Sequence, residues 1–285
     1  MDLTIFSTPK KLKGEQAHIQ WNAITSWTQL NPNPQILLIS DEHGVGNLAS
    51  DLMVEHIKNI KTNSYGTPLV NNIFSQAMKK SRNNVLCYVN SDIIIDPRLM
   101  MIIDKIYKEF KNPLIVSRRW NLQVESKINF NKNDWFDKIS NEAQLKKELY
   151  PKTGIDLFIF NKNLFFEIPP FAVGRTCWDN WLLYEARKRG ATIIDITSAI
   201  TLIHQNHSHK KFHTTDDNRF KKGIESKENL KLAKGFGYLL TLDDADFHLS
   251  SSMVLIKKTK SSFESLISKI KLLTHRLFDK YIYLR

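Results

Sequence analysis

The sequence predicts an α/β protein whose mostly parallel central sheet is flanked by helices. Within the first 120 residues, short apolar runs rich in Val, Ile and Leu alternate with stretches of helical periodicity. This alternation is typical of successive strand–helix–strand units. The apolar runs also end in polar clusters, and parallel strands bring such clusters to one edge of a sheet. A ligand site is therefore expected at the carboxyl edge.

The elements of this first part follow one another closely. A first strand begins at Leu3 and ends in a polar turn at Ser7 and Thr8. The stretch 15–30 has apolar residues three and four positions apart, which favours an amphipathic helix. The remaining expected elements are a strand at 35–40, a helix at 47–53, a strand at 54–57, a loop at 63–68, a helix at 69–80, strands at 85–89 and 113–116, and between them a helix that begins near Pro97.

The pattern is looser after residue 120. The expected elements are a helix at 135–149, a strand at 155–160, a loop at 168–175, a helix at 178–189, a strand at 191–196, an apolar run at 201–203 and a helix at 216–234. We expect one domain over 1–210 and a helical extension over 211–285. The stretch 261–285 has an apolar stripe opposite a basic face, so it either docks on the domain or contacts an anionic membrane.

The composition narrows the class of protein. Apolar residues make up 42% and charged residues 25%, and no apolar run approaches the length of a membrane span. Cys87 and Cys177 are expected to be buried free thiols in a reducing cytosol. The acidic N-terminus does not resemble a secretory signal. We therefore expect a cytoplasmic protein, with peripheral contact at the inner face of the membrane as a further possibility.

The charge of the chain points to anionic partners. The net charge is +12, which favours phosphorylated small molecules, acidic membrane surfaces or nucleic acid. No RRM, KH or zinc-finger pattern is present, so nucleic acid is not expected. The chain also lacks a Walker A sequence, a complete dinucleotide fingerprint and a Gly-x-Ser-x-Gly elbow. These absences argue against a P-loop NTPase, a dehydrogenase and an α/β-hydrolase.

The stretch Asn90-Ser91-Asp92 is the first candidate for chemistry, because it directly follows the apolar run 85–89. A carboxylate at that position would lie at the rim of the sheet, where Asp92 could hold Mn²⁺ or Mg²⁺ against a diphosphate. The alternative is a strand that ends in an ordinary turn. His204, with His207 and His209 after it, would complete the site if the chain folds back, and otherwise these are exposed loop residues.

Two further carboxylates are candidates for acid–base chemistry. Asp179 lies in the first turn of a predicted helix, where the helix dipole favours its ionised form; it is either a general base or a helix cap. Asp156 lies in a strand-like run, where a buried carboxylate needs partners, so it is either paired structurally or lines the site.

In their order along the chain, several blocks resemble bacterial glycosyltransferase-like proteins of the GT-A (Rossmann-like, nucleotide-diphospho-sugar transferase) fold. The resemblance covers roughly residues 3–210. The blocks are Thr4-Ile5-Phe6-Ser7-Thr8, the Asp41 loop, Tyr65-Gly66-Thr67-Pro68, Tyr88 to Ile94, Ser117 to Trp120, Gly154 to Phe158, and the most specific one, Pro169 to Trp181.

The resemblance implies a metal-dependent glycosyltransferase, and more narrowly a hexosyltransferase in cell-surface polysaccharide synthesis. It implies an NDP-sugar donor, most often a UDP-sugar, and a saccharide or lipid-linked acceptor. It gives Asp92 and His204 as metal ligands and Asp179, with Asp156, as catalytic carboxylates. Asn90 replaces the first acid of the Asp-x-Asp metal motif, so Asp92 would carry most of the coordination. The implied donor-binding residues are Ser7, Thr8, Asp41, Tyr65, Thr67, Asn90, Ser91, Arg118 and Arg119.

Two other functions remain open at this point. A nucleotidyltransferase acting on sugar phosphates could use a similar sheet, but it should have a Gly-rich basic loop after the first strand, and here no glycine precedes Gly14. A non-catalytic basic protein that binds membrane or nucleic acid would show no metal-dependent nucleotide binding and would tolerate Asp92→Ala.

Overall fold

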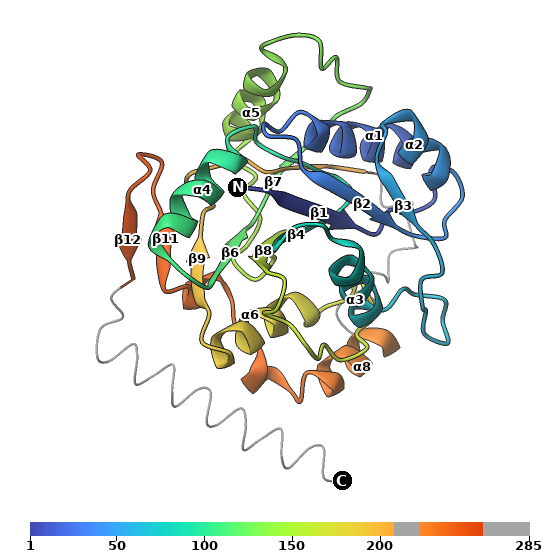
Figure 1. Cartoon of the computed structure of the whole chain (residues 1–285). Helices are drawn as coiled ribbons and strands as arrows, with labels where there is room; N and C mark the ends of the chain where they lie inside the picture. Colours follow the sequence, from blue (N-terminus) through green and yellow to red (C-terminus); the bar gives the residue numbers. More distant parts are fainter. Residues whose placement is uncertain (208–222, 259–285) are drawn as a thin grey trace.

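The computed structural model describes residues 1–207 and 223–258, and within them a nine-stranded sheet forms the centre of the molecule (Figure 1). Its strand order is β12-β11-β9-β6-β8-β4-β1-β2-β3. Most neighbouring strands are parallel, which confirms the predicted α/β class. The strands are β1 (Leu3–Ser7), β2 (Gln35–Ile39), β3 (Glu55–Ile57), β4 (Val85–Val89), β6 (Pro113–Ser117), β8 (Leu157–Asn161), β9 (Thr192–Asp195), β11 (Phe247–Leu249) and β12 (Leu255–Lys257).

Helices cover both faces of this sheet. Successive residues of a strand point to opposite faces, so each strand contributes side chains to two hydrophobic cores. On β1, Leu3 and Ile5 pack in one core with α1, α2 and α4, whereas Phe6 packs in a second core with α3 and α6. All five residues of β1 are buried, as expected for a strand covered on both faces. The helices are α1 (Glu15–Thr28), α2 (Val45–Asp51), α3 (Val70–Lys80), α4 (Leu99–Glu109) and α6 (Trp178–Lys188).

Strand β8 runs antiparallel to both of its neighbours, β4 and β6. Its apolar sequence predicts a strand but contains no signal for direction. Because β8 runs in the opposite direction to β4 and β6, it begins at the edge of the sheet where β4 and β6 end. The start of β8, with Asp156 directly before it, therefore lies beside the end of β4.

A second, three-stranded sheet has the order β5-β10-β7. It consists of β5 (Ile93–Ile94), β10 (Ile203–Gln205) and β7 (Trp120–Leu122), and α5 (Trp135–Lys146) contributes to an aromatic core around it. The pairing of β10 with β5 places His204 opposite Ile93. These strands are two or three residues long, which is too short for a periodic pattern, so the sequence did not predict this sheet.

The region after residue 223 differs from the expected helical extension. This region contains helix α8 (Ile224–Leu232) and two short 3-10 helices (Phe236–Tyr238 and Leu242–Asp244). It also contains β11 and β12, which extend the central sheet beside β9. Part of the 211–285 segment therefore belongs to the main sheet. His209, the start of the helix expected at 216–234 and the stretch 261–285, with its expected membrane contact, lie outside the described residues. None of the helices in the described part has the length and apolar character that crossing a bilayer requires.

Candidate functional site

The ends of β1, β4 and β6 lie at the same edge of the sheet, because β1 and β4 are parallel and β8 is antiparallel to both β4 and β6. Ser7 ends β1, Asn90 to Asp92 follow β4, and Arg118 and Arg119 follow β6. The sequence therefore places these clusters correctly at one edge. The geometry below shows which of the side chains meet.

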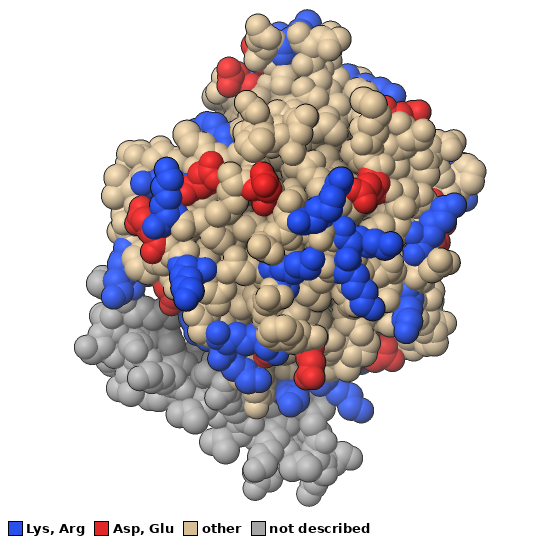
Figure 2. All heavy atoms as spheres, viewed as in Figure 1, with Lys and Arg blue, Asp and Glu red and all other residues tan. Residues whose placement is uncertain are grey.

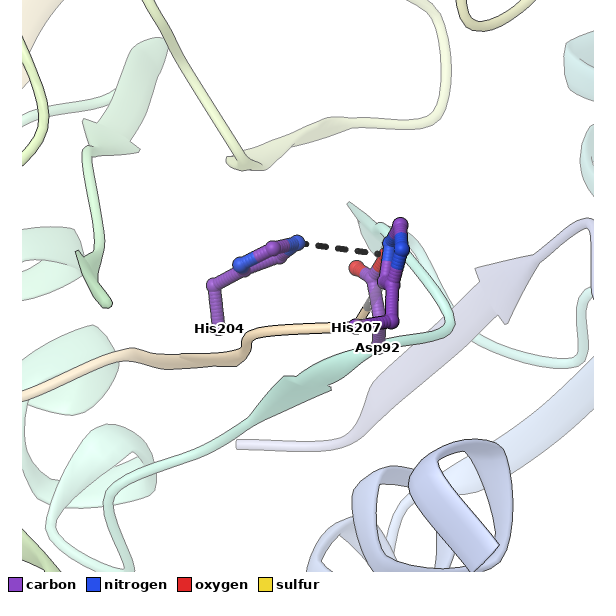
Figure 3. A group of neighbouring side chains, drawn as sticks. All are labelled: Asp92, His204 and His207. Carbon is purple, nitrogen blue, oxygen red and sulfur yellow. Dashed lines mark ion pairs between the residues drawn. The ribbon is translucent and has the colours of Figure 1, made fainter. Parts of the chain in front are cut away.

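Asp92 and two histidines form a compact group at this edge (Figure 3). Nε2 of His204 lies 3.5 Å from Oδ2 of Asp92, and Nε2 of His207 lies 3.8 Å from the same oxygen. One potential ligand atom from each residue lies within 4.8 Å of the others. Asp92 is in the turn between β4 and β5, and the pairing of β10 with β5 brings His204 to it. Sequence reasoning named His207 in the histidine cluster but did not include it among the predicted ligands.

The electrostatics of this group favour a charged Asp92. Burial alone would raise the pKa of this carboxyl, but His204, His207 and the charge of Lys10 hold it well below its usual range. The Oδ1 atom of Asp92 is buried and accepts no hydrogen bond from any described residue. A carboxylate with an unused oxygen beside two imidazoles suits Mn²⁺ and other cations that accept nitrogen ligands. The donor set therefore fits a divalent cation.

Asp156 forms a second cluster beside the first. Its Oδ1 atom accepts a hydrogen bond of 3.1 Å from the Asn90 side chain and forms an ion pair with Arg119. The side-chain oxygen of Asn90 in turn accepts a hydrogen bond of 3.2 Å from the hydroxyl of Tyr88. Burial raises the pKa of Asp156 despite the neighbouring guanidinium. The other oxygen, Oδ2, is buried and accepts no hydrogen bond from the described residues. Asp156 is therefore both structurally paired and able to accept one further donor.

The guanidinium of Arg119 is held by an aromatic stack. It lies 4.0 Å from the ring centroid of Tyr150, and the carbonyl of Tyr150 accepts a hydrogen bond of 2.9 Å from Arg118. The same ring packs against Gly154, where an added Cβ would overlap it. Tyr150 is thus enclosed between Arg119 and Gly154, and this fixes the guanidinium on Asp156.

Replacing Gly154 with Ala is expected to lower kcat/KM of a reaction at this site by about tenfold, because loss of a partly desolvated cation–π contact costs on the order of 1–2 kcal/mol. The displaced Tyr150 ring would release Arg119 from Asp156. Tyr150→Leu should cause a similar loss, whereas Tyr150→Phe keeps the ring and should behave as wild type. Steady-state kinetics on the three variants, with thermal melting as a check on folding, would measure this. Wild-type kinetics in Gly154→Ala would show that the stack has no role.

Asp179 lies in the first turn of α6, as the sequence predicts. Burial raises its pKa to about 7, the negative charge of Asp156 adds to that effect, and hydrogen bonds from backbone N–H groups oppose it. The sequence-based expectation was that the helix dipole keeps this carboxylate ionised. In the structure, desolvation outweighs the helix terminus. The group can therefore exchange a proton near neutral pH.

The turn before Asp179 is unusual. Cys177 precedes α6 with a φ of 85°, a conformation that residues other than glycine rarely adopt. Such backbone conformations persist where the surrounding structure enforces them, often near functional sites. Asn229 of α8 contributes here: it is 1% exposed and binds the backbone of Ala172 and Thr176. The loop that leads into α6 is thus held in place from α8.

The remaining predicted donor-binding residues are less closely grouped. Ser91 hydrogen-bonds to Gln20, and the hydroxyl of Ser7 is buried without a described partner. Asp41 is exposed, and its carboxylate accepts the backbone N–H groups of Asn59 and Ile60. Asp41 therefore closes the loop after β3. None of the contacts among the described residues ties this carboxylate to Asp92.

The loop that carries Tyr65 and Thr67 is bound to α8. Tyr65 is 54% exposed, and Glu225 accepts hydrogen bonds from the side chains of Thr67 and Asn63. Arg175 forms an ion pair with the same glutamate. Thr8 is partly buried after β1. The structure thus brings together Asn90, Asp92, Arg119, Asp156 and His204, whereas Thr67 is bound to Glu225 and the side chain of Tyr65 is exposed.

No protein-family model matches the chain, and no curated protein matches it. Among solved structures, it is similar to TarS 1–349 from S. aureus, with 10% identity over 84% of this chain and 80% of that chain and a TM-score of 0.47. It is also similar to glucosyl-3-phosphoglycerate synthase from Mycobacterium tuberculosis in complex with Mg²⁺ and UDP, with 11% identity over 91% and 88% of the two chains and a TM-score of 0.49.

The topology itself identifies the fold class. The central sheet is mostly parallel, and both faces are covered by helices. The described residues therefore have a Rossmann-like α/β fold. This confirms the α/β fold class expected from the sequence.

Proposed function

We propose that this protein is a glycosyltransferase that moves a sugar from a nucleotide-diphosphate donor to a saccharide or lipid-linked acceptor. The observation that carries the proposal is the meeting of two clusters at the carboxyl edge. One is the group of Asp92, His204 and His207, and the other is the Asp156–Arg119 pair, with Asp179 contributing its charge nearby. Glycosyl transfer from a diphosphate needs positive charge to offset the leaving group and a base to take the acceptor proton, and these residues could supply both.

Asp92, His204 and His207 would hold the divalent cation, Mn²⁺ or Mg²⁺, and the bound ion would offset the negative charge of the diphosphate. Arg118 offers a further donor, because its Nε atom is buried and has no hydrogen-bond partner among the described residues. An N–H of this kind can bind a phosphate oxygen by a charge-assisted hydrogen bond. The diphosphate would therefore contact both Arg118 and the ion held by Asp92, His204 and His207, which we call the metal group.

In the transfer step, the acceptor hydroxyl oxygen forms a bond to the anomeric carbon of the sugar, while the bond from that carbon to the diphosphate oxygen breaks. The nucleoside diphosphate leaves with the electron pair, and Asp179 takes the hydroxyl proton. The unpartnered oxygen of Asp156 would accept a hydroxyl of the donor sugar. This assignment describes an inverting reaction with Asp179 as base.

A thermal-shift screen of UDP-, GDP-, dTDP- and CMP-sugars, with and without Mn²⁺, tests the proposal. At a donor concentration of about 100 Kd, binding should stabilise the folded chain by about 2.7 kcal/mol, which is a rise of several degrees in Tm. We expect a UDP-sugar to give the largest shift, and only with the metal. Absence of a metal-dependent shift for every donor would contradict the proposal. A larger shift with a nucleoside triphosphate and a sugar 1-phosphate would favour a nucleotidyltransferase instead.

A further inference from the structure

A groove with a volume of about 390 Å³ lies along α6, away from the residues described above. Its walls include three aromatic side chains, Trp181, Tyr184 and Tyr238, and three cationic ones, Lys188, Arg189 and Lys234. The residues contributed by α6 are three to four positions apart, so they form one stripe on the helix. At 3.6 residues per turn, Asp179 points to roughly the opposite side of α6 from this stripe. The groove is therefore separate from the candidate active site.

The aromatic walls of the groove are rigid. The rings of Tyr184 and Tyr238 meet edge to face, with centroids 5.2 Å apart and an interplanar angle of 81°. Trp181 is only 8% exposed and packs against Phe171, with centroids 5.3 Å apart. Fixed aromatic surfaces lose little conformational entropy when a ligand binds. The groove is therefore organised before any ligand arrives.

The charged side chains of the groove include a small excess of cations, and on the face drawn in Figure 2 Lys and Arg are more widespread than Asp and Glu. Two carboxylates, Glu167 and Glu185, also line it. Glu185 is 5% exposed and is occupied by Arg189, whose Nε lies 2.7 Å from one carboxylate oxygen, and by Lys188 at 3.5 Å from the other. Lys234 is exposed and makes no ion pair with a described residue. Three cations against two acids leave a net positive lining, which complements an anionic ligand.

A sugar ring matches this combination of surfaces. One face of a pyranose consists of C–H groups that can pack on an aromatic side chain, and its rim of hydroxyl groups can hydrogen-bond to Lys, Arg and Glu. A carboxylate or phosphate on the sugar would add a charge-assisted hydrogen bond to Lys234 or Lys188. A lipid tail would instead need a wholly apolar lining, and five charged side chains in this groove exclude that.

We propose that the groove binds an acidic oligosaccharide at a second site on the back of α6. The proposal rests on the proposed function and deepens it, because it assigns the acceptor or product chain to acidic saccharides. Helix α6 has 11 residues and is therefore about 16 Å long, a length that a few linked sugars can span. The site would keep a growing chain close to the enzyme between transfers, which raises its effective concentration.

The test uses isothermal titration of the intact protein with tetragalacturonate, and with maltotetraose as the neutral chain of equal length. We expect the acidic tetramer to bind and the neutral one to bind at least about tenfold more weakly, since one charge-assisted contact is worth that factor. Tyr184→Ala and Lys234→Glu should each weaken binding of the acidic tetramer by about tenfold or more. Lys108→Glu makes the same charge change at an exposed position of α4 and should have no effect.

A wrong groove proposal and a wrong proposed function would give different results in these measurements. Donor-induced thermal shifts with Mn²⁺, measured on the same samples, should be unchanged in Lys234→Glu. If neither tetramer binds, if the two bind equally, or if Lys234→Glu binds like wild type, the groove proposal is wrong even where donor binding is intact. If the acidic tetramer binds but no donor does, the groove stands as a saccharide site and the transferase function falls.

Discussion

The Asp179→Asn variant is expected to lower kcat for sugar transfer by about 10²- to 10⁴-fold, which is the range contributed by a positioned general base. Asn has nearly the same shape as Asp but cannot accept the hydroxyl proton. Donor binding should be unchanged, because Asp179 is not part of the metal group. Transfer rates under saturating donor, together with thermal shifts by donor and Mn²⁺, would separate the two effects. Retained turnover in this variant would remove Asp179 as the base.

Asp137→Asn is the matched control. Asp137 is also an acid in the first turn of a helix, but it lies on α5 and is exposed. Loss of a favourable charge–dipole contact at that position should cost at most about 1 kcal/mol of stability and no activity. A parallel loss of activity in both variants would point to a general effect of helix charge rather than to catalysis.

The pH dependence follows from the same carboxyl. Its pKa is about 7 in the folded chain and 3.8 ordinarily, so the folded state binds this proton more tightly than the unfolded state. The contribution of this carboxyl to the free energy of unfolding is therefore largest below pH 3.8, and it is lost as pH rises from there through about 7. Activity should change in the opposite direction and rise with pH through the same region, because only the ionised form accepts a proton. Asp179→Asn should consequently raise Tm at pH 8 but not at pH 4.

Replacing Asp92 with Ala is expected to abolish metal-dependent donor binding and to reduce transfer by about 10³-fold or more, as expected when a charged group that holds the diphosphate is lost. His204 and His207 would remain, but two imidazoles cannot replace the carboxylate oxygen as a ligand for Mg²⁺ or Mn²⁺. His204→Ala and His207→Ala should each weaken Mn²⁺ binding about 10- to 100-fold. Titration of Mn²⁺ alone, followed by its paramagnetic resonance signal, measures the site without any sugar.

His43→Ala provides the control for the histidine variants, because His43 is exposed in the loop between β2 and α2. Its Mn²⁺ affinity should equal that of wild type. If His207→Ala also binds Mn²⁺ like wild type, His207 is a neighbour of the site and not a ligand. If Asp92→Ala does so, the metal group is not the ion's site and the proposed function loses its main support.

The sequence predicted the fold well where long patterns exist. Strand β4 is a continuous apolar run, β2 is apolar after Gln35, and α1 and α4 show clear helical spacing, so their approximate bounds could be predicted from hydrophobic patterns. The direction of β8 and the pairing of β10 with β5 could not be predicted in this way. Both depend on contacts between residues that are far apart in sequence, and no local pattern records them.

The same difference between local patterns and long-range contacts applies to the residues of the candidate site. Asp92 could be predicted because it lies in the turn after a buried strand, and Asp179 because it lies in the first turn of a helix. The raised pKa of Asp179 could not be predicted, since it comes from burial by tertiary packing. The enclosure of Tyr150 between Arg119 and Gly154 joins three loop positions without any periodic signal. Tyr65 and Thr67 were predicted from resemblance alone, and the structure shows Thr67 bound to Glu225.

The antiparallel course of β8 also constrains how the molecule folds. β8 pairs with β4 and β6 on its two sides, so it closes a gap between strands that precede it by tens of residues. Closing such long-range pairs costs loop-closure entropy, which slows folding. Asp156 reaches Asn90 and Arg119 only when β8 is in place. The cluster beside the group of Asp92, His204 and His207 can therefore form only after β8 has paired with both β4 and β6, so its assembly depends on completion of the middle of the sheet.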